Sequence, residues 1–196
     1  MTDETPHATS RRTLLAGMAF MAAAGALSSR AKAGGDMKHV VLLGDSIFDN
    51  KRYVGEEPDV IDQLKADLPA GWTASLNALD GSTTVDMAGQ LKRLPPDATH
   101  LVVSVGGNDA LKHKDLLDEK ASSVAGVLDK LGKIRGEFQA NYRAMLDGLL
   151  AVKLPAAVCT IYEARYQNPD THRIAATGLS VFNDIITREA FGRGLP

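Results

Sequence analysis

The chain has 196 residues, of which 44% are hydrophobic and 23% charged, and its formal net charge is −2. These values describe an ordinary globular protein of one domain. Aromatic residues make up only 5% and the basic residues are scattered, so neither a nucleic acid nor an anionic membrane is expected as a partner. The single cysteine, Cys159, allows no intramolecular disulfide and lies in an apolar run, where a small core residue is expected.

Residues 1–33 have the three parts of an export signal in the required order. The pair Arg11-Arg12 precedes an apolar run over 14–27, which is too short for a bilayer because a span takes about 20 residues. An Ala-x-Ala pattern then predicts cleavage after Ala33. The arginine pair resembles a twin-arginine signal, which predicts a mature domain over 34–196 in the periplasm or outside the cell, without stable membrane association. The alternative is an amphipathic N-terminal helix.

After this segment, short apolar runs alternate with segments of helical periodicity. Alternation of this kind predicts βαβ units and a parallel sheet that is covered by helices on both faces. A break between two helices is placed at Gly132. A fifth strand is expected after the last helix and is absent as far as Pro196. Strands are predicted at 39–43, 73–79, 100–105 and 156–162, and helices at 59–68, 84–94, 116–131, 137–152 and 174–191.

Three loops follow the first three predicted strands: GDSIFDN at 44–50, DGSTTVD at 80–86 and GGND at 106–109. The carboxyl ends of parallel strands share one edge of the sheet, where open α/β proteins bind ligands, so these loops are expected to line one crevice. Gly-Asp-Ser alone is also an ordinary turn sequence. Together, however, the loops supply a nucleophile and oxyanion donors for acyl transfer: the Ser46 hydroxyl, the N–H groups of Ser46 and Gly81, and the Asn108 carboxamide.

These motifs, in this order, resemble those of the SGNH hydrolases, also called GDSL-type esterases, over residues 38–196. The resemblance implies a flavodoxin-like three-layer α/β/α sandwich. It implies Ser46 as the nucleophile, with Gly81 and Asn108 as further oxyanion donors. It also implies hydrolysis of carboxylic esters, such as carbohydrate O-acetyl groups, with a small-molecule substrate and with no metal or cofactor. Ile47 stands where the family usually has leucine.

The catalytic base is the one part of the family's active site that this sequence does not supply. The family takes it from an Asp-x-x-His segment after the fifth strand, which this sequence does not contain, so we expect a C-terminal truncation. Asp97 and His100 have the matching spacing, but His100 begins a strand and lies about 20 Å from the crevice at ~3.3 Å per residue. His113 and His172 lie at the correct edge, although surface loops are the simpler interpretation for both.

Other functions stay open at this point. The crevice fits an inactive exported module that binds a ligand but lacks its base. A flavodoxin-like nucleotide binder is disfavoured because the first loop has too few hydroxyl groups for a phosphate, although the fold permits one. The absence of a Gly-x-Ser-x-Gly elbow disfavours an α/β-hydrolase active site. Asp45 and Asp109 are interpreted as carboxylates that order their loops. Without its fifth strand, the domain is expected to expose an aggregation-prone sheet edge.

Overall fold

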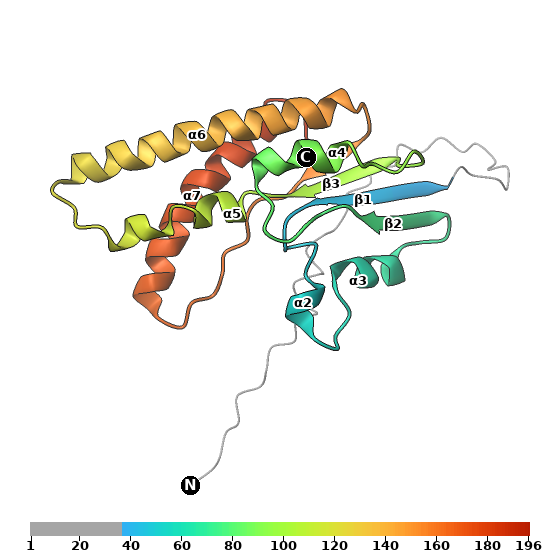
Figure 1. Ribbon diagram of the computed structural model, residues 1–196, viewed down its shortest axis with the longest axis horizontal. Helices are drawn as coiled ribbons and strands as arrows, with labels where there is room; N and C mark the ends of the chain where they lie inside the picture. Colours follow the sequence, from blue (N-terminus) through green and yellow to red (C-terminus); the bar gives the residue numbers. More distant parts are fainter. Residues whose placement is uncertain (1–36) are drawn as a thin grey trace, which may run out of the picture. The chain divides into compact units, whose positions relative to one another are not determined.

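The computed structural model describes residues 37–196 (Figure 1), so the predicted export signal over 1–33 lies outside the described residues. One four-stranded parallel sheet forms the centre, in the order β2-β1-β3-β4. β2 and β3 lie on opposite sides of β1, so the strand order reverses direction between β1 and β3. The carboxyl edge at such a switch point is where α/β proteins bind ligands. The strands are β1 (Lys38–Gly44), β2 (Trp72–Leu76), β3 (His100–Ser104) and β4 (Ala156–Val158).

Helices cover both faces of the sheet, which confirms the predicted three-layer α/β/α arrangement. Figure 1 shows α3 on one side of the sheet and α4 and α6 on the other. None of the helices within 37–196 combines the length and the apolarity that a bilayer crossing requires. The helical elements are α2 (Lys51–Val54), α3 (Val60–Asp67), η1 (Thr84–Asp86), α4 (Met87–Leu91), α5 (Gly107–Leu111), η2 (Lys114–Asp118), α6 (Val124–Ala151) and α7 (Pro169–Phe191).

The core lies in two layers because successive strand residues point to opposite faces. Val41 and Leu43 are buried in the larger layer, with α4, α6 and α7. Val40 and Leu42 are buried in the smaller layer, where α3 packs. Cys159 is half-buried against this smaller layer, as expected for a packing residue, and burial raises the pKa of its thiol.

The predicted helix break at Gly132 is wrong. The structure has one helix, α6, across this position, whereas 114–118 form the separate element η2. No atom lies within 4 Å of a Cβ built on Gly132, so this glycine does not mark a close contact. A glycine inside a helix costs only about 1 kcal/mol relative to alanine, which the buried C-terminal half of α6 outweighs.

Other differences concern element boundaries and short helices. β2 and β4 end several residues before the predicted ends, because their apolar runs continue into loops after strand pairing stops. The predicted helix 84–94 is shorter and divided into η1 and α4. α7 begins at Pro169, earlier than predicted, because the Asn168 side chain caps it by accepting two backbone N–H groups at 2.9 Å each.

Candidate active site

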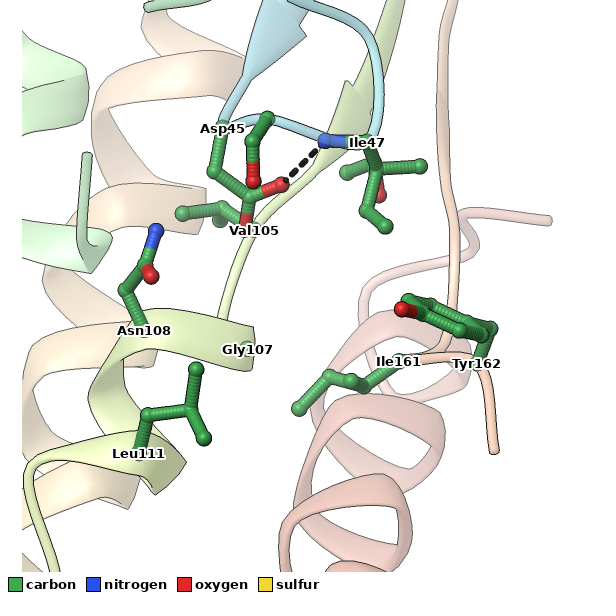
Figure 2. Close-up of a pocket in the computed structure, with 10 residues that line it drawn as sticks. Asp45, Ile47, Val105, Gly107, Asn108, Leu111, Ile161 and Tyr162 are labelled. Atoms are coloured by element: carbon green, nitrogen blue, oxygen red, sulfur yellow. Dashed lines mark hydrogen bonds between the residues drawn. The ribbon is translucent and has the colours of Figure 1, made fainter. Parts of the chain in front are cut away.

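A cavity of about 100 Å³ opens at the carboxyl edge of the sheet, beyond β1 and β3. In Figure 2, Asp45 and Asn108 lie on one side of this cavity, and Ile161 and Tyr162 on the other. Two of the predicted site residues, Ser46 and Asn108, are therefore brought together, beside apolar side chains that suit an acyl group. The lining consists of Asp45, Ser46, Ile47, Ser104, Val105, Gly107, Asn108, Leu111, Ile161 and Tyr162.

The end of β1 explains why Gly44 precedes the Asp-Ser pair. Gly44 has φ 132°, and a Cβ atom there would lie 1.8 Å from the carbonyl oxygen of Ser104. Only glycine can therefore occupy this position. The next residue, Asp45, still donates its N–H to the Ser104 carbonyl at 3.1 Å. The start of the loop that carries Ser46 is therefore fixed relative to β3.

Asp45 orders the loop that carries Ser46, as predicted. Its Oδ1 accepts the Ile47 N–H at 3.0 Å, the bond drawn in Figure 2. Its carbonyl accepts the N–H groups of Phe48 and Asp49 at 3.1 and 3.0 Å. Burial raises the pKa of the Asp45 carboxyl, and the Ile47 N–H opposes this shift. Repulsion from Asp109 raises the Asp45 pKa further, because the two carboxylates lie close to each other.

The third loop is tied to the second by its two polar residues. Asn108 Nδ2 donates to the Ser82 carbonyl at 2.9 Å. Asp109 is buried and accepts the Thr84 N–H at 3.0 Å and the Thr84 hydroxyl at 2.7 Å. Asp109 is thus a loop-ordering carboxylate, as predicted, although it orders the second loop rather than its own.

Gly81 does not line the cavity. Its N–H faces the carboxylate of Asp80 and helps to lower the pKa of that carboxyl. The largest contribution to that lowering is a hydrogen bond from the Tyr53 hydroxyl, at 2.9 Å, and Arg52 adds another at 3.1 Å. The role of Gly81 as an oxyanion donor therefore stays a prediction.

Sequence reasoning did not find the apolar wall of the cavity. Ile161 and Tyr162 belong to a segment that was predicted as strand and that instead leaves the sheet after β4. Asn183 of α7 holds this wall: its Oδ1 accepts the Ile161 N–H at 2.8 Å and its Nδ2 donates to the Ile161 carbonyl at 2.9 Å. No local sequence signal reveals this pairing, because the partners are far apart in the chain.

No histidine among residues 37–196 lines the Ser46 cavity. His100 begins β3, as predicted, and burial lowers the pKa of its imidazole. His113 lines a second cavity, with Lys112 and Lys130. His172 lies 2.9 Å from Glu163 through Nε2 and 3.2 Å from a backbone carbonyl through Nδ1, so both ring nitrogens face acceptors.

A different serine cluster joins the amino end of β1 to Ser75, the penultimate residue of β2. His39 Nε2 lies 2.8 Å from the Ser75 hydroxyl, and His39 Nδ1 lies 3.1 Å from an Asp97 carboxylate oxygen. The second contact lacks the alignment of a hydrogen bond. None of these three residues lines either cavity. No group of three or more acidic, histidine or cysteine side chains within 37–196 is arranged to hold a metal ion.

Comparison with known proteins connects this site to one family. Residues 42–196 match the family model described as the GDSL-like Lipase/Acylhydrolase family. A search of curated proteins finds no match. Among solved structures, the chain is similar to the extracellular lipase from Streptomyces rimosus, with 18% identity, a TM-score of 0.53, and coverage of 81% of this chain and 78% of that one.

Two further solved structures have the same fold. LAE5, an alpha/beta hydrolase enzyme from the metagenome of Lake Arreo in Spain, is 18% identical, with a TM-score of 0.55 over 82% of this chain and 75% of that one. AlinE4, an SGNH-hydrolase family esterase, is 19% identical, with a TM-score of 0.54 over the same shares, 82% and 75%. At these identities the structural similarity shows a shared α/β fold.

Proposed function

Because the chain belongs to the GDSL-like lipase/acylhydrolase family, we propose that it is an exported serine hydrolase that cleaves carboxylic esters. The observation that carries the proposal is the position of Ser46. It lies at the end of β1, in a cavity that also contains the Asn108 carboxamide and an apolar wall. A nucleophile, a hydrogen-bond donor and an acyl-binding surface in one cavity are three of the parts that ester cleavage by a serine requires, and a general base is the fourth.

In the proposed reaction, Ser46 Oγ attacks the acyl carbon of the ester and its proton passes to a base. The oxyanion that forms is stabilised by the Ser46 N–H and the Asn108 side-chain N–H, each worth about 3–4 kcal/mol of barrier. The Gly81 N–H, which faces Asp80 in this structure, would have to turn toward the cavity to act as a third donor. The base returns that proton to the departing alcohol, and it then takes a proton from water, which attacks the acyl-serine, releases the acid and restores Ser46. The residues 37–196 supply no histidine at the cavity to act as this base.

The proposed substrates carry short acyl groups, such as acetyl. A cavity of about 100 Å³, walled by Leu111, Ile161 and Tyr162, has room for a small apolar group. Hydrolysis of a series of aryl esters tests this proposal, with the acetate expected to have the highest kcat/KM. Preference for esters of ten or more carbons would contradict it.

Export is the second part of the proposal, and the arginine pair with its apolar run supports it. Expression in a bacterium with a twin-arginine pathway is expected to give a periplasmic protein that begins at Gly34. Replacing Arg11 and Arg12 with lysine should hold the uncleaved chain inside the cell. N-terminal sequencing of the fractions checks both outcomes.

The direct test of hydrolase function is labelling of the full chain with a fluorophosphonate, which reacts with activated serines. Ser46→Ala is expected to abolish labelling, because it removes the reacting oxygen. The matched control is Ser75→Ala, which removes the serine beside His39 and is expected to leave labelling within two-fold of the wild type. Labelling that survives Ser46→Ala would contradict the assignment of the nucleophile.

The second candidate function is ligand binding without catalysis. It is favoured by one observation, the absence of any histidine of residues 37–196 from the cavity. This function predicts that the wild-type chain is not labelled at Ser46 and does not hydrolyse aryl esters, but still binds a short-chain ester or acid. Calorimetric titration with such a ligand, compared between wild type and Asn108→Ala, separates the two functions.

A further inference from the structure

Gln90 on α4 is a buried polar residue that the reaction outlined above does not use. It is 1% exposed, so each of its polar atoms needs a partner inside the protein. Its Oε1 accepts the Gly44 N–H at 2.8 Å, and its Nε2 donates to the Gly44 carbonyl at 2.7 Å. The same Nε2 donates to the Ser82 hydroxyl at 3.1 Å.

The sheet explains why Gly44 needs this side chain. Pairing of β1 with β2 stops at Leu42 and Leu76, and the next two residues of the β2 chain both donate to the Leu42 carbonyl. On this side, the Gly44 N–H therefore has no strand partner. The Gln90 side-chain amide supplies the missing acceptor for this N–H, and it shares the Gly44 carbonyl with the Leu79 N–H, which donates to that carbonyl at 3.1 Å. On the other side, Gly44 pairs with Ser104 of β3.

The helix that carries Gln90 is itself anchored in the core. Met87 of α4 is fully buried in the larger core layer. Leu91 of α4 packs against this same layer and lies close to Gly148 of α6. Because close-packed interiors move little, α4 is a firm support for a side chain that reaches the sheet edge.

We propose that Gln90 is the positioning residue of the Ser46 site, an inference that rests on the proposed hydrolase function. Because Gln90 is hydrogen-bonded to both the N–H and the carbonyl of Gly44, it sets the direction in which the chain leaves β1 toward Ser46, two residues later. Through Ser82 it holds the second loop, and the Ser82 carbonyl in turn accepts Asn108 Nδ2. One side chain thus keeps the nucleophile loop aligned with a predicted oxyanion donor.

The chemical consequence is geometric. A nucleophile and its oxyanion donors act together only when the reacting atoms are held close to the required geometry, and a misplacement of about 1 Å can cost about 100-fold in rate. A Gln90 that served stability alone would change the fraction of folded protein but not the rate per folded molecule. The test must therefore measure both quantities.

Three variants of the full chain separate these roles. Gln90→Leu keeps the approximate size and removes all three hydrogen bonds. Gln90→Glu keeps an acceptor for the Gly44 N–H but places a second oxygen against the Gly44 carbonyl. Ser82→Ala removes only the link to the second loop, and this mild change keeps the test valid if the Gln90 variants do not fold. Glu189→Gln is the control, since Glu189 is also buried and hydrogen-bonded, to Arg143 and Arg193.

Two readouts are needed for each variant. The first is the rate of fluorophosphonate labelling of Ser46 per folded molecule, with folding measured by urea denaturation. We expect a 10- to 100-fold loss for both Gln90 variants, a 3- to 10-fold loss for Ser82→Ala, and a change within two-fold for Glu189→Gln. The second is amide hydrogen exchange, which should accelerate at least 10-fold in both 44–50 and 80–86 for the Gln90 variants and at least three-fold there for Ser82→Ala.

The outcomes are distinguishable from failure of the proposed function. If the wild-type chain is not labelled at all, the hydrolase proposal fails, and hydrogen exchange still decides whether Gln90 positions the loops. The positioning role is overturned if the variants that fold, Ser82→Ala included, label at the wild-type rate per folded molecule. It is also overturned if exchange in the two loops rises no more than exchange in α6.

Discussion

Two serines lie in polar surroundings, Ser46 beyond the carboxyl end of β1 and Ser75 on β2 beside His39 from the amino end of β1, and they differ in what accompanies them. At the carboxyl edge, Ser46 lies in a cavity with Asn108 and an apolar wall, but no histidine of the described residues reaches it. Ser75, the penultimate residue of β2, has His39 from the amino edge at 2.8 Å and a carboxylate beyond it, but lines neither cavity.

This difference shows that triad-like distances alone do not make an active site. A reacting serine also needs space for the substrate and donors directed at the developing oxyanion. At the amino edge, His39 instead joins β1 to β2 through Ser75 and contacts Asp97 in the turn before β3. Its side chain is 11% exposed, in keeping with a structural role. The carboxyl edge has the space and the donor, and it is where substitutions should change chemistry.

The largest expected effect is on Asn108. If the proposed function holds, Asn108→Ala should lower the rate of ester hydrolysis, or of Ser46 labelling, by about 100- to 1000-fold, because it removes one of the proposed oxyanion donors. Steady-state kinetics on an aryl acetate measures it. Asn168→Ala is the control, since it removes a helix cap of α7 and should leave the rate per folded molecule unchanged. A loss below ten-fold for Asn108→Ala would remove this residue from the oxyanion hole.

The next effect is on stability at the same edge. Asp109→Asn should lower the free energy of unfolding by about 1–3 kcal/mol, because a buried N–H group would then face the donors of Thr84. Urea denaturation at pH 7 measures the change. Asp115→Asn, at an exposed position on η2, should cost less than about 0.5 kcal/mol. Equal costs for the two variants would argue that Asp109 does not hold the second loop.

At the amino edge, the effect should fall on stability and spare the chemistry. His39→Phe should cost about 1 kcal/mol, because the hydrogen bond to the Ser75 hydroxyl is lost. Labelling of Ser46 per folded molecule should stay within two-fold of the wild type. A ten-fold loss of labelling would mean that the His39 contacts and the Ser46 site are coupled.

The smallest effect concerns pH. Burial raises the pKa of Asp45, so the unfolded chain ionises this carboxyl at a lower pH than the folded protein does. Folding stability therefore falls as the pH rises from the ordinary aspartate pKa through the raised folded value. Asp45→Asn keeps an acceptor for the Ile47 N–H and removes this penalty. We expect a small gain in stability at pH 7 that disappears below pH ~3.8, measured by urea denaturation across this range.

The pKa of Glu189 is shifted in the opposite direction to that of Asp45, so its effect on stability has the opposite pH dependence. Hydrogen bonds from Arg143, supported by Gln139 and Arg193, lower the pKa of Glu189 to about 2. Its stabilising contribution is thus present above the ordinary glutamate pKa and is lost as the pH falls toward 2. Glu189→Gln should therefore flatten the acid side of the stability profile, whereas Asp45→Asn should raise its neutral side.

The strand–helix alternation, the parallel sheet and the position of Ser46 after a strand end are all predictable from the sequence. These features depend on local periodicity and on residues that are close together in the chain, such as Gly44 and Ser46. The same local reasoning misjudged Gly132, because the buried half of α6 outweighs the weak preference of one glycine against helix.

Which distant groups meet at the site depends on how the whole chain packs. Gln90 lies 46 residues from Gly44, and Asn183 lies 22 residues from Ile161, yet each amide holds the backbone of its partner. Packing likewise places His39 beside Ser75 and not in the cavity that contains Ser46. Such pairings follow from how helices pack on the sheet, and packing is a property of the whole core that no short segment of sequence encodes.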